Sequence, residues 1–173
     1  MTRVIGLDFE TYCDLDLTKV GQDRYFAHPS FQVLCGGIYD PALPQETVEY
    51  DFVQWHTEAT EQFVRHMDDV TSQGVVIAHN AGFERQCLRK LGFSPQVEIN
   101  ILDSAVHSRM MGGSSKLEYA ARQFTNERKL ETGLELIKLF SIPNERNKFQ
   151  APSAELLRSD PELMEKWKQF LLS

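Results

Sequence analysis

The fold is decided by the stretch Gly74-Val75-Val76-Ile77-Ala78-His79-Asn80-Ala81-Gly82-Phe83-Glu84. Its residues 75–78 form a short apolar run, which is typical of a strand at the centre of a sheet. Residues 81–91 follow with apolar side chains on one helical face, and residues 57–72 before the strand also have helical spacing. A buried strand between two helices predicts an α/β fold with a partly parallel sheet.

Four further runs have the apolar or alternating character of strands: residues 4–9, 31–39, 47–53 and 99–102. The first three precede the deciding stretch and have the order of a meander. Beyond Asp103 the spacing is helical, with breaks at Gly112-Gly113, Pro143, Pro152 and Pro161. The sequence therefore predicts a mixed β-sheet flanked by helices, with a helical C-terminal half. The carboxyl ends of its parallel strands are the expected place for a site.

The composition is typical of a globular protein, with 42% hydrophobic and 25% charged residues in a length of 173. No apolar run approaches the 18 or so residues of a membrane span, and an acid at position 8 interrupts any signal-peptide core. These features argue against membrane and secreted classes. The three cysteines are widely spaced and odd in number, which fits neither a disulfide framework nor a zinc ribbon. We therefore expect one domain over residues 1–173, in the cytoplasm.

The charge is distributed unevenly along the chain. Residues 1–84 hold 4 basic and 14 acidic side chains, whereas residues 85–173 hold 14 basic and 11 acidic ones, and together they give the net charge of −7. A negative total would argue against a nucleic-acid partner, because phosphates are bound largely by Lys and Arg, but the average over the whole chain is misleading here. The asymmetry instead indicates a division of labour between the halves, and ordinary solvated surface is the alternative explanation.

Two acids lie at the end of the first predicted strand. Asp8 and Glu10 are two residues apart, so their side chains share one face of that strand. A carboxylate next to an apolar run costs energy unless hydrogen bonds or a cation compensate it. Oxygen ligands favour Mg²⁺ or Mn²⁺. A strand end that meets solvent is the alternative for this short pattern.

A third acid, Glu84, follows the strand at 75–78 and lies on the same helical face as Asn80. Asn80 is well suited to cap the helix that follows it. That role does not explain Glu84, which lies close to where a neighbouring parallel strand presents Asp8 and Glu10. The sequence predicts a cluster of three carboxylates.

These residues resemble the DEDD family of 3′–5′ exonucleases, and especially the proofreading domains of bacteriophage family A DNA polymerases. Asp8-Phe9-Glu10-Thr11 resembles the first motif of the family, Asp-x-Glu. Asn80-x-x-Phe83-Glu84 is similar to the second, Asn-x-x-(Tyr or Phe)-Asp, with Glu in place of Asp. Further along, Asp103-Ser104-Ala105 resembles the segment that opens the next helix, and Lys129-x-x-x-Gly133-x-x-Leu136-Ile137-x-x-Phe140-x-x-Pro143 is similar to a stretch of the phage polymerases. The resemblance covers nearly the whole chain and implies an RNase H-like fold.

The resemblance also implies a mechanism and a set of catalytic residues. Members of the family hydrolyse the 3′-terminal phosphodiester of a DNA strand with two Mg²⁺ or Mn²⁺ ions, one activating a water and one stabilising the leaving oxygen. Carried over, Asp8 bridges both metals, Glu10 serves the metal that holds the attacking water, and Glu84 serves the outer site. The partners implied are a single-stranded DNA 3′ end and a polymerase domain, in cis or in trans. For a phage-encoded chain the location is the host cytoplasm.

One part of the family pattern is missing. The third motif, Tyr-x-x-x-Asp or His-x-x-x-x-Asp on a late helix, has no counterpart in the right place, since Tyr12 to Asp16 directly follows the first motif. A helix resembling the one before that motif is present at 164–170. We therefore expect the chain to end just short of the third motif, to bind metal weakly and to cleave slowly or not at all.

The resemblance places Thr11 and Phe83 beside the terminal nucleotide and Asn80 in the same motif. His79 is a candidate phosphate contact, and so are Arg122, Arg128 and Lys129 in the basic half of the chain. Each has a plain structural alternative: core packing for Phe83, a hydrogen-bonded strand end for His79, and solvated helix faces for the basic residues. Asp103 is best explained as a helix N-cap.

The leading hypothesis is thus a metal-dependent 3′–5′ exodeoxyribonuclease domain that proofreads for a polymerase. A ribonuclease of the same superfamily keeps the fold and changes the substrate. A non-catalytic module that binds a strand end or docks a polymerase is a different class, and an unrelated fold with scattered acids also stays open.

Overall fold

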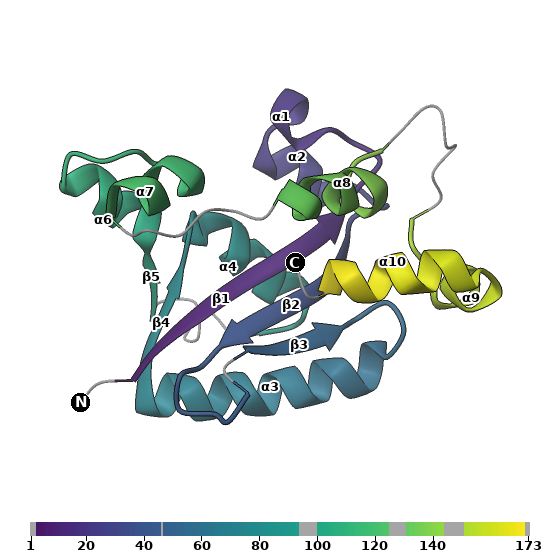
Figure 1. Ribbon diagram of the computed structural model, residues 1–173, viewed down its shortest axis with the longest axis horizontal. Coiled ribbons are helices and arrows are strands. Elements are labelled where there is room, and N and C mark those ends of the chain that lie inside the picture. Colours follow the sequence, from purple (N-terminus) through teal and green to yellow (C-terminus); the bar gives the residue numbers. More distant parts are fainter. Residues whose placement is uncertain (1–2, 46, 94–99, 125–130, 144–150, 172–173) are drawn as a thin grey trace. The chain divides into compact units, whose positions relative to one another are not determined.

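The computed structural model (Figure 1) describes residues 3–45, 47–93, 100–124, 131–143 and 151–171, and its elements keep the labels of that figure. Its strands form a five-stranded sheet in the order β3-β2-β1-β4-β5. They are β1 (Arg3–Tyr12), β2 (Gln32–Tyr39), β3 (Thr47–Asp51), β4 (Gly74–Ala78) and β5 (Ile101–Asp103). The order confirms that the first three strands are neighbours, as a meander requires, and the mixed sheet confirms the α/β class.

Nine helices lie within the described residues, and they follow the strands in the expected pattern. They are α1 (Leu17–Val20), α2 (Gln22–Ala27), α3 (His56–Gln73), α4 (Ala81–Lys90), α6 (Ser104–Met110), α7 (Leu117–Phe124), α8 (Glu131–Phe140), α9 (Ala154–Ser159) and α10 (Pro161–Leu171). The helices α3 and α4 confirm the two predicted around the deciding stretch, and α6 to α10 confirm the helical C-terminal half.

The chain divides into two compact units, and several elements contribute to both. The first unit comprises residues 1–8, 37–48 and 61–129, and the second comprises residues 9–36, 49–60 and 130–173.

The first unit contains the parallel part of the sheet. β1 pairs with β4 from Arg3–Gly74 to Gly6–Ile77, and β4 pairs with β5 from Val76–Ile101 to Ala78–Asp103, both in parallel. Its core is apolar and fully buried, and it is formed by side chains of these strands and of α3 and α4: Ile5, Leu7, Phe63, Met67, Val70, Val76, Ala78, Cys87, Leu88 and Ile101. Burial of the sheet face against helices therefore explains the apolar run that predicted β4.

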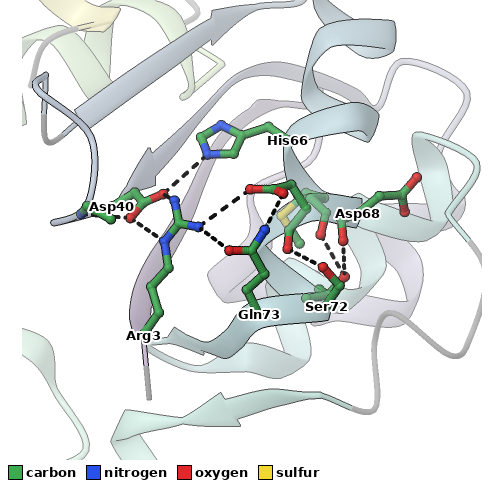
Figure 2. Close-up of polar contacts among 10 residues, drawn as sticks. Arg3, Asp40, His66, Asp68, Ser72 and Gln73 are labelled. Atoms are coloured by element: carbon green, nitrogen blue, oxygen red, sulfur yellow. Dashed lines mark hydrogen bonds and ion pairs between the residues drawn. The ribbon is translucent and has the colours of Figure 1, made fainter. Parts of the chain in front are cut away.

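The start of β4 depends on a glycine. A Cβ added to Gly74 would lie 2.5 Å from the backbone oxygen of Arg3, so any other residue would force the two strands apart. The side chain of the same Arg3 donates hydrogen bonds to Asp40, a buried carboxylate that follows β2, and to Gln73 at the end of α3. His66 of α3 also faces Asp40, with Nε2 3.6 Å from Oδ2 (Figure 2). This polar cluster fixes the end of α3 against the first strand.

The second unit has an aromatic core. Phe140, Trp167 and Phe170 pack with ring centroids 5.0–5.4 Å apart, against buried Tyr12 and Leu34. The indole Nε1 of Trp167 donates to Asp51 Oδ2 at 2.7 Å. Helices α8 and α10 are thus held by apolar burial together with one polar bond.

Two features differ from the expectation or sharpen it. The helices α1 and α2 were not predicted, because each is shorter than two turns and shows little periodicity. Pro161 begins α10 rather than only ending the helix before it, since the first helical position tolerates a residue without an N–H.

All three cysteines are free and buried. Within the described ranges, no helix has the length and apolar character needed to cross a membrane.

Candidate functional site

The first strand presents its acids on one face. Along β1 the residues Ile5, Leu7 and Phe9 are buried, whereas Asp8 is exposed and Glu10 is half-buried, as the alternation of a strand requires. Asp8 is the last residue of this strand in the first unit, and Glu10 belongs to the second.

Glu84 lies in the first turn of α4 and is buried, with 3% of its surface exposed. Its Oε2 atom has no hydrogen-bond partner among the described residues. The pKa of Glu84 is raised to about 8, mainly because the side chain is buried. The negative charges of Asp8 and Asp103 also contribute to this increase. An ionised Glu84 is therefore costly unless a proton or a cation compensates its charge.

Asp103 ends β5 and begins α6. Its Oδ1 accepts from Ala105 N at 2.8 Å and from Val106 N at 3.3 Å, which confirms the predicted N-cap. The same oxygen accepts from the backbone N of Asn80 at 3.2 Å. Asp103 thus joins the ends of two neighbouring parallel strands.

Asn80 connects β4 to α4 in an unusual backbone conformation. Its φ of 65° and ψ of 48° are left-handed, and it is the one non-glycine residue with positive φ in the described part of the chain. Asn adopts this conformation more readily than most residues. It occupies the N-cap position, but its side chain makes no capping hydrogen bond there, so the predicted capping by this side chain is wrong. The sharp turn instead depends on the backbone and on Asp103.

His79 is occupied by structural contacts. Its Nδ1 lies 3.0 Å from Ser104 Oγ, and its Nε2 lies 2.8 Å from the carbonyl oxygen of Ser115. Both ring nitrogens are thereby used to hold α6 and the segment before α7 next to the end of β4. This arrangement matches the structural alternative for His79 rather than a phosphate contact.

The other predicted residues are placed as follows. Phe83 is half-buried in the first turn of α4. Thr11 is buried in the second unit, where its Oγ1 lies 2.9 Å from the Tyr25 hydroxyl. Arg122 is exposed on α7 and pairs with Glu118 at 2.7 Å. Arg128 and Lys129 lie outside the described residues. The negative charges of Asp8 and Asp103 both act on Glu84.

The donor set is chemically suited to a hard divalent cation. Asp8 and Glu84 offer carboxylate oxygens, and the partnerless Oε2 of Glu84 is the kind of buried atom that a cation would satisfy. In the described ranges, however, no three His, Cys, Asp or Glu side chains are grouped closely enough to hold a metal ion. The predicted cluster of three carboxylates is therefore not found among the described residues. The metal ion stays a prediction, for which the residue types and the burial of Glu84 are suitable.

Sequence reasoning missed the part that Asp103 plays in the electrostatics of this site. It was explained as a helix cap only, although it ends the strand next to β4. The rule that placed Glu84 near Asp8, the convergence of parallel strand ends, applies to Asp103 as well. A strand only three residues long gave too weak a signal for that step.

Comparisons with known proteins give two further findings. The family described as Domain of unknown function (DUF2779) matches residues 5–138, a range that includes Asp8, Glu10, Glu84 and Asp103. A protein named DNA polymerase from Bacillus phage SP02 is 29% identical over 174 residues, which cover 98% of this chain. The chain spans about a quarter, 26%, of that relative's length.

Proposed function

The chain belongs to the DUF2779 family, and on this premise we propose that it is a metal-dependent 3′–5′ exonuclease domain that acts on DNA beside a polymerase. The observation that carries the proposal is Glu84. It is a buried carboxylate whose Oε2 has no hydrogen-bond partner in the described part of the chain, and Asp8 and Asp103 act on its charge. Perturbed carboxylates of this kind cluster at catalytic sites.

The site would hold Mg²⁺ or Mn²⁺ through Asp8 and Glu84 of the first unit. A ligand role for Glu10, which belongs to the second unit, rests on the Asp-x-Glu motif alone. When bound, two such ions activate a water and stabilise the leaving 3′ oxygen of a phosphodiester. The chain's own residues supply a preformed frame for this chemistry. Asp103 fixes the backbone of Asn80, and Asn80 sets the start of the helix that carries Glu84.

The burial of Glu84 would also favour metal binding. A carboxylate shielded from water keeps its oxygen available for a cation instead of a hydration shell, and its position is fixed by the surrounding helix. Asp8, by contrast, is exposed and open to an incoming strand. Glu84 would therefore be a buried metal ligand with a fixed position, and Asp8 a ligand accessible from solvent.

The polymerase partner is supported by the similarity to the phage protein. That relative is named DNA polymerase, and this chain is similar to about a quarter of it. A nuclease domain and a polymerase domain need the same strand end, so proofreading places them together in one chain or in one complex.

The experiment measures Mn²⁺ binding by calorimetry and nucleotide release from a 3′-labelled single strand of DNA. Glu84→Gln and Asp8→Asn should each reduce Mn²⁺ affinity at least tenfold and abolish any release, whereas Glu162→Gln on exposed α10 serves as the matched control. Release that persists in both site variants or in excess chelator contradicts the proposal. Equal turnover of matched RNA would assign a ribonuclease instead, and binding of a strand end that is indifferent to Asp8 and Glu10 variants would assign a docking module.

A further inference from the structure

The helices α6 and α7 form a hairpin, residues 104–124, with an unusually apolar exposed surface. Figure 1 shows the two helices side by side after β5. Met110 and Met111 are 79% and 70% exposed, and Tyr119 is 52% exposed. Large apolar side chains gathered at this exposure indicate an interaction surface.

The hairpin is a built structure and not a loose turn. Gly113 N donates to Ser108 O at 2.8 Å, and Ser108 Oγ donates to Ser114 O at 2.5 Å. A Cβ added to Gly113 would lie 2.7 Å from the Phe124 ring, so the end of α7 packs directly over the turn. Its exposed side chains are therefore presented by a defined backbone.

The hairpin is attached to the candidate site. It begins at Asp103, whose side chain caps α6 and accepts from Asn80. His79 holds both Ser104 and the Ser115 carbonyl, so the first residue of α6 and the segment before α7 are tied to the end of β4. All of these residues belong to the first unit. A ligand bound on the hairpin would therefore lie next to the strand ends that carry the acids.

The charge of the hairpin differs from that of the rest of the chain. Residues 104–124 carry three basic side chains and one acid, whereas the remaining residues carry 15 basic side chains and 24 acids. Lys116 Nζ lies 5.9 Å from the centre of the Tyr119 ring, so a cation and an exposed aromatic face are adjacent. Val106, Arg109 and Met110 are exposed and lie at helical spacing on one face of α6.

We propose that the α6–α7 hairpin binds single-stranded DNA, with bases contacting Tyr119 and the methionines and phosphates contacting Arg109 and Lys116. Flat or polarisable side chains beside cations are the pattern by which proteins hold single strands without reading sequence. A net positive charge on this one surface is complementary to a polyanion. The choice of nucleic acid as the partner rests on the proposed function.

The test uses the whole chain in excess chelator, so that binding is measured without cleavage. The probe is a fluorescein-labelled oligothymidylate followed by anisotropy. Tyr119→Ala should weaken binding about tenfold, while Tyr119→Phe should restore it because a phenyl ring still stacks. Lys116→Ala and Arg109→Ala should each lower the salt dependence of log K by about 0.7, the value for one phosphate contact on a single strand.

Matched controls lie elsewhere on the surface. Tyr39→Ala removes a tyrosine of similar exposure, and Lys168→Ala removes an exposed lysine of α10, so both should leave binding unchanged. Circular dichroism melts show whether each variant folds, and Tyr119→Phe serves where the alanine variant does not. The inference is overturned if the parent chain does not bind the probe, or if the hairpin variants bind it as the parent does.

Two more outcomes separate this inference from its premise. Hairpin variants that lose self-association in sedimentation but keep the probe would assign the surface to a second copy of the chain and overturn the inference. Binding that depends on the hairpin while Asp8→Asn leaves nucleotide release intact would support the inference and overturn the proposed catalytic site. A preference for matched oligouridylate over the DNA probe would reject DNA as the strand.

Discussion

Replacing Glu84 by glutamine should stabilise the metal-free chain, and the gain should grow with pH. In the folded protein, burial and then the charges of Asp8 and Asp103 raise the pKa of Glu84 to about 8, whereas a carboxyl of this type has a pKa near 4.5 when it is not perturbed. Glutamine has nearly the same shape and carries no charge at any pH. The variant therefore removes the cost of the charge and keeps the volume of the side chain.

The size of the effect follows from these two pKa values. Below pH 4.5 the carboxyl is protonated in both states, so the parent and the variant should have similar stability. Between about 4.5 and 8 the unfolded chain releases the proton and the folded chain retains it, so the parent loses about 1.4 kcal/mol of stability per pH unit. At pH 7 the difference amounts to about 3 kcal/mol, and it stops growing above the pKa of the folded state.

The assay is urea unfolding in chelator at several values between pH 4 and 8.5. Glu84→Gln should show a flatter pH dependence than the parent, and Glu162→Gln, an exposed glutamate paired with Lys166, should follow the parent. Adding Mn²⁺ should stabilise the parent and not the Glu84 variant, because a ligand stabilises only the state that binds it. Equal slopes for the parent and Glu84→Gln, or a variant that is less stable at pH 7, would refute the burial argument.

Three further substitutions test contacts that stabilise the two units, each by urea or thermal unfolding. Asp40→Ala should lower stability at neutral pH and weaken the loss of stability in acid, because the hydrogen bond from Arg3 lowers the pKa of Asp40 and the stability it contributes is lost as pH falls. Trp167→Phe should cost about 1–3 kcal/mol, since it removes the indole donor to Asp51 while keeping an aromatic ring. Gly74→Ala should cost about 1–3 kcal/mol, because its Cβ would collide with the backbone of Arg3, and unchanged stability would contradict this contact.

The sheet could be predicted from the sequence because its strands are either fully apolar or clearly alternating. β4 is an example, since Val76 and Ala78 are buried between helices and leave no polar residue within the run. The helix α3 was equally clear, because Phe63, Met67 and Val70 repeat at helical spacing over 18 residues. Local patterns suffice where one burial face repeats over several turns.

The site was only partly predictable, because its details depend on contacts between distant residues. Asn is a residue type that commonly caps helices through its side chain. The backbone of Asn80 is instead left-handed, and its N–H donates to Asp103, 23 residues away. His79 is next to Asn80 in the sequence and was a candidate phosphate contact, but its two ring nitrogens contact Ser104 and Ser115. The hydrogen bonds of Asn80 and His79 join residues far apart in the sequence, so they produce no local pattern. The sequence could therefore identify these two residues as candidates but could not predict their contacts.

The acidic total charge and a nucleic-acid partner can be reconciled by where the charges lie. An anionic strand is repelled by Asp8, Glu84 and Asp103 until a cation or a proton neutralises them, so these residues cannot supply its first contact. The hairpin that starts at Asp103 can, because its cations are exposed on a surface with a net positive charge. The hairpin is tied through His79 to the end of β4, so a strand captured there is already held next to the acids. In the proposed function, capture by the hairpin and hydrolysis at the carboxylates would therefore place separate demands on the charge of this chain, and only hydrolysis would require a metal.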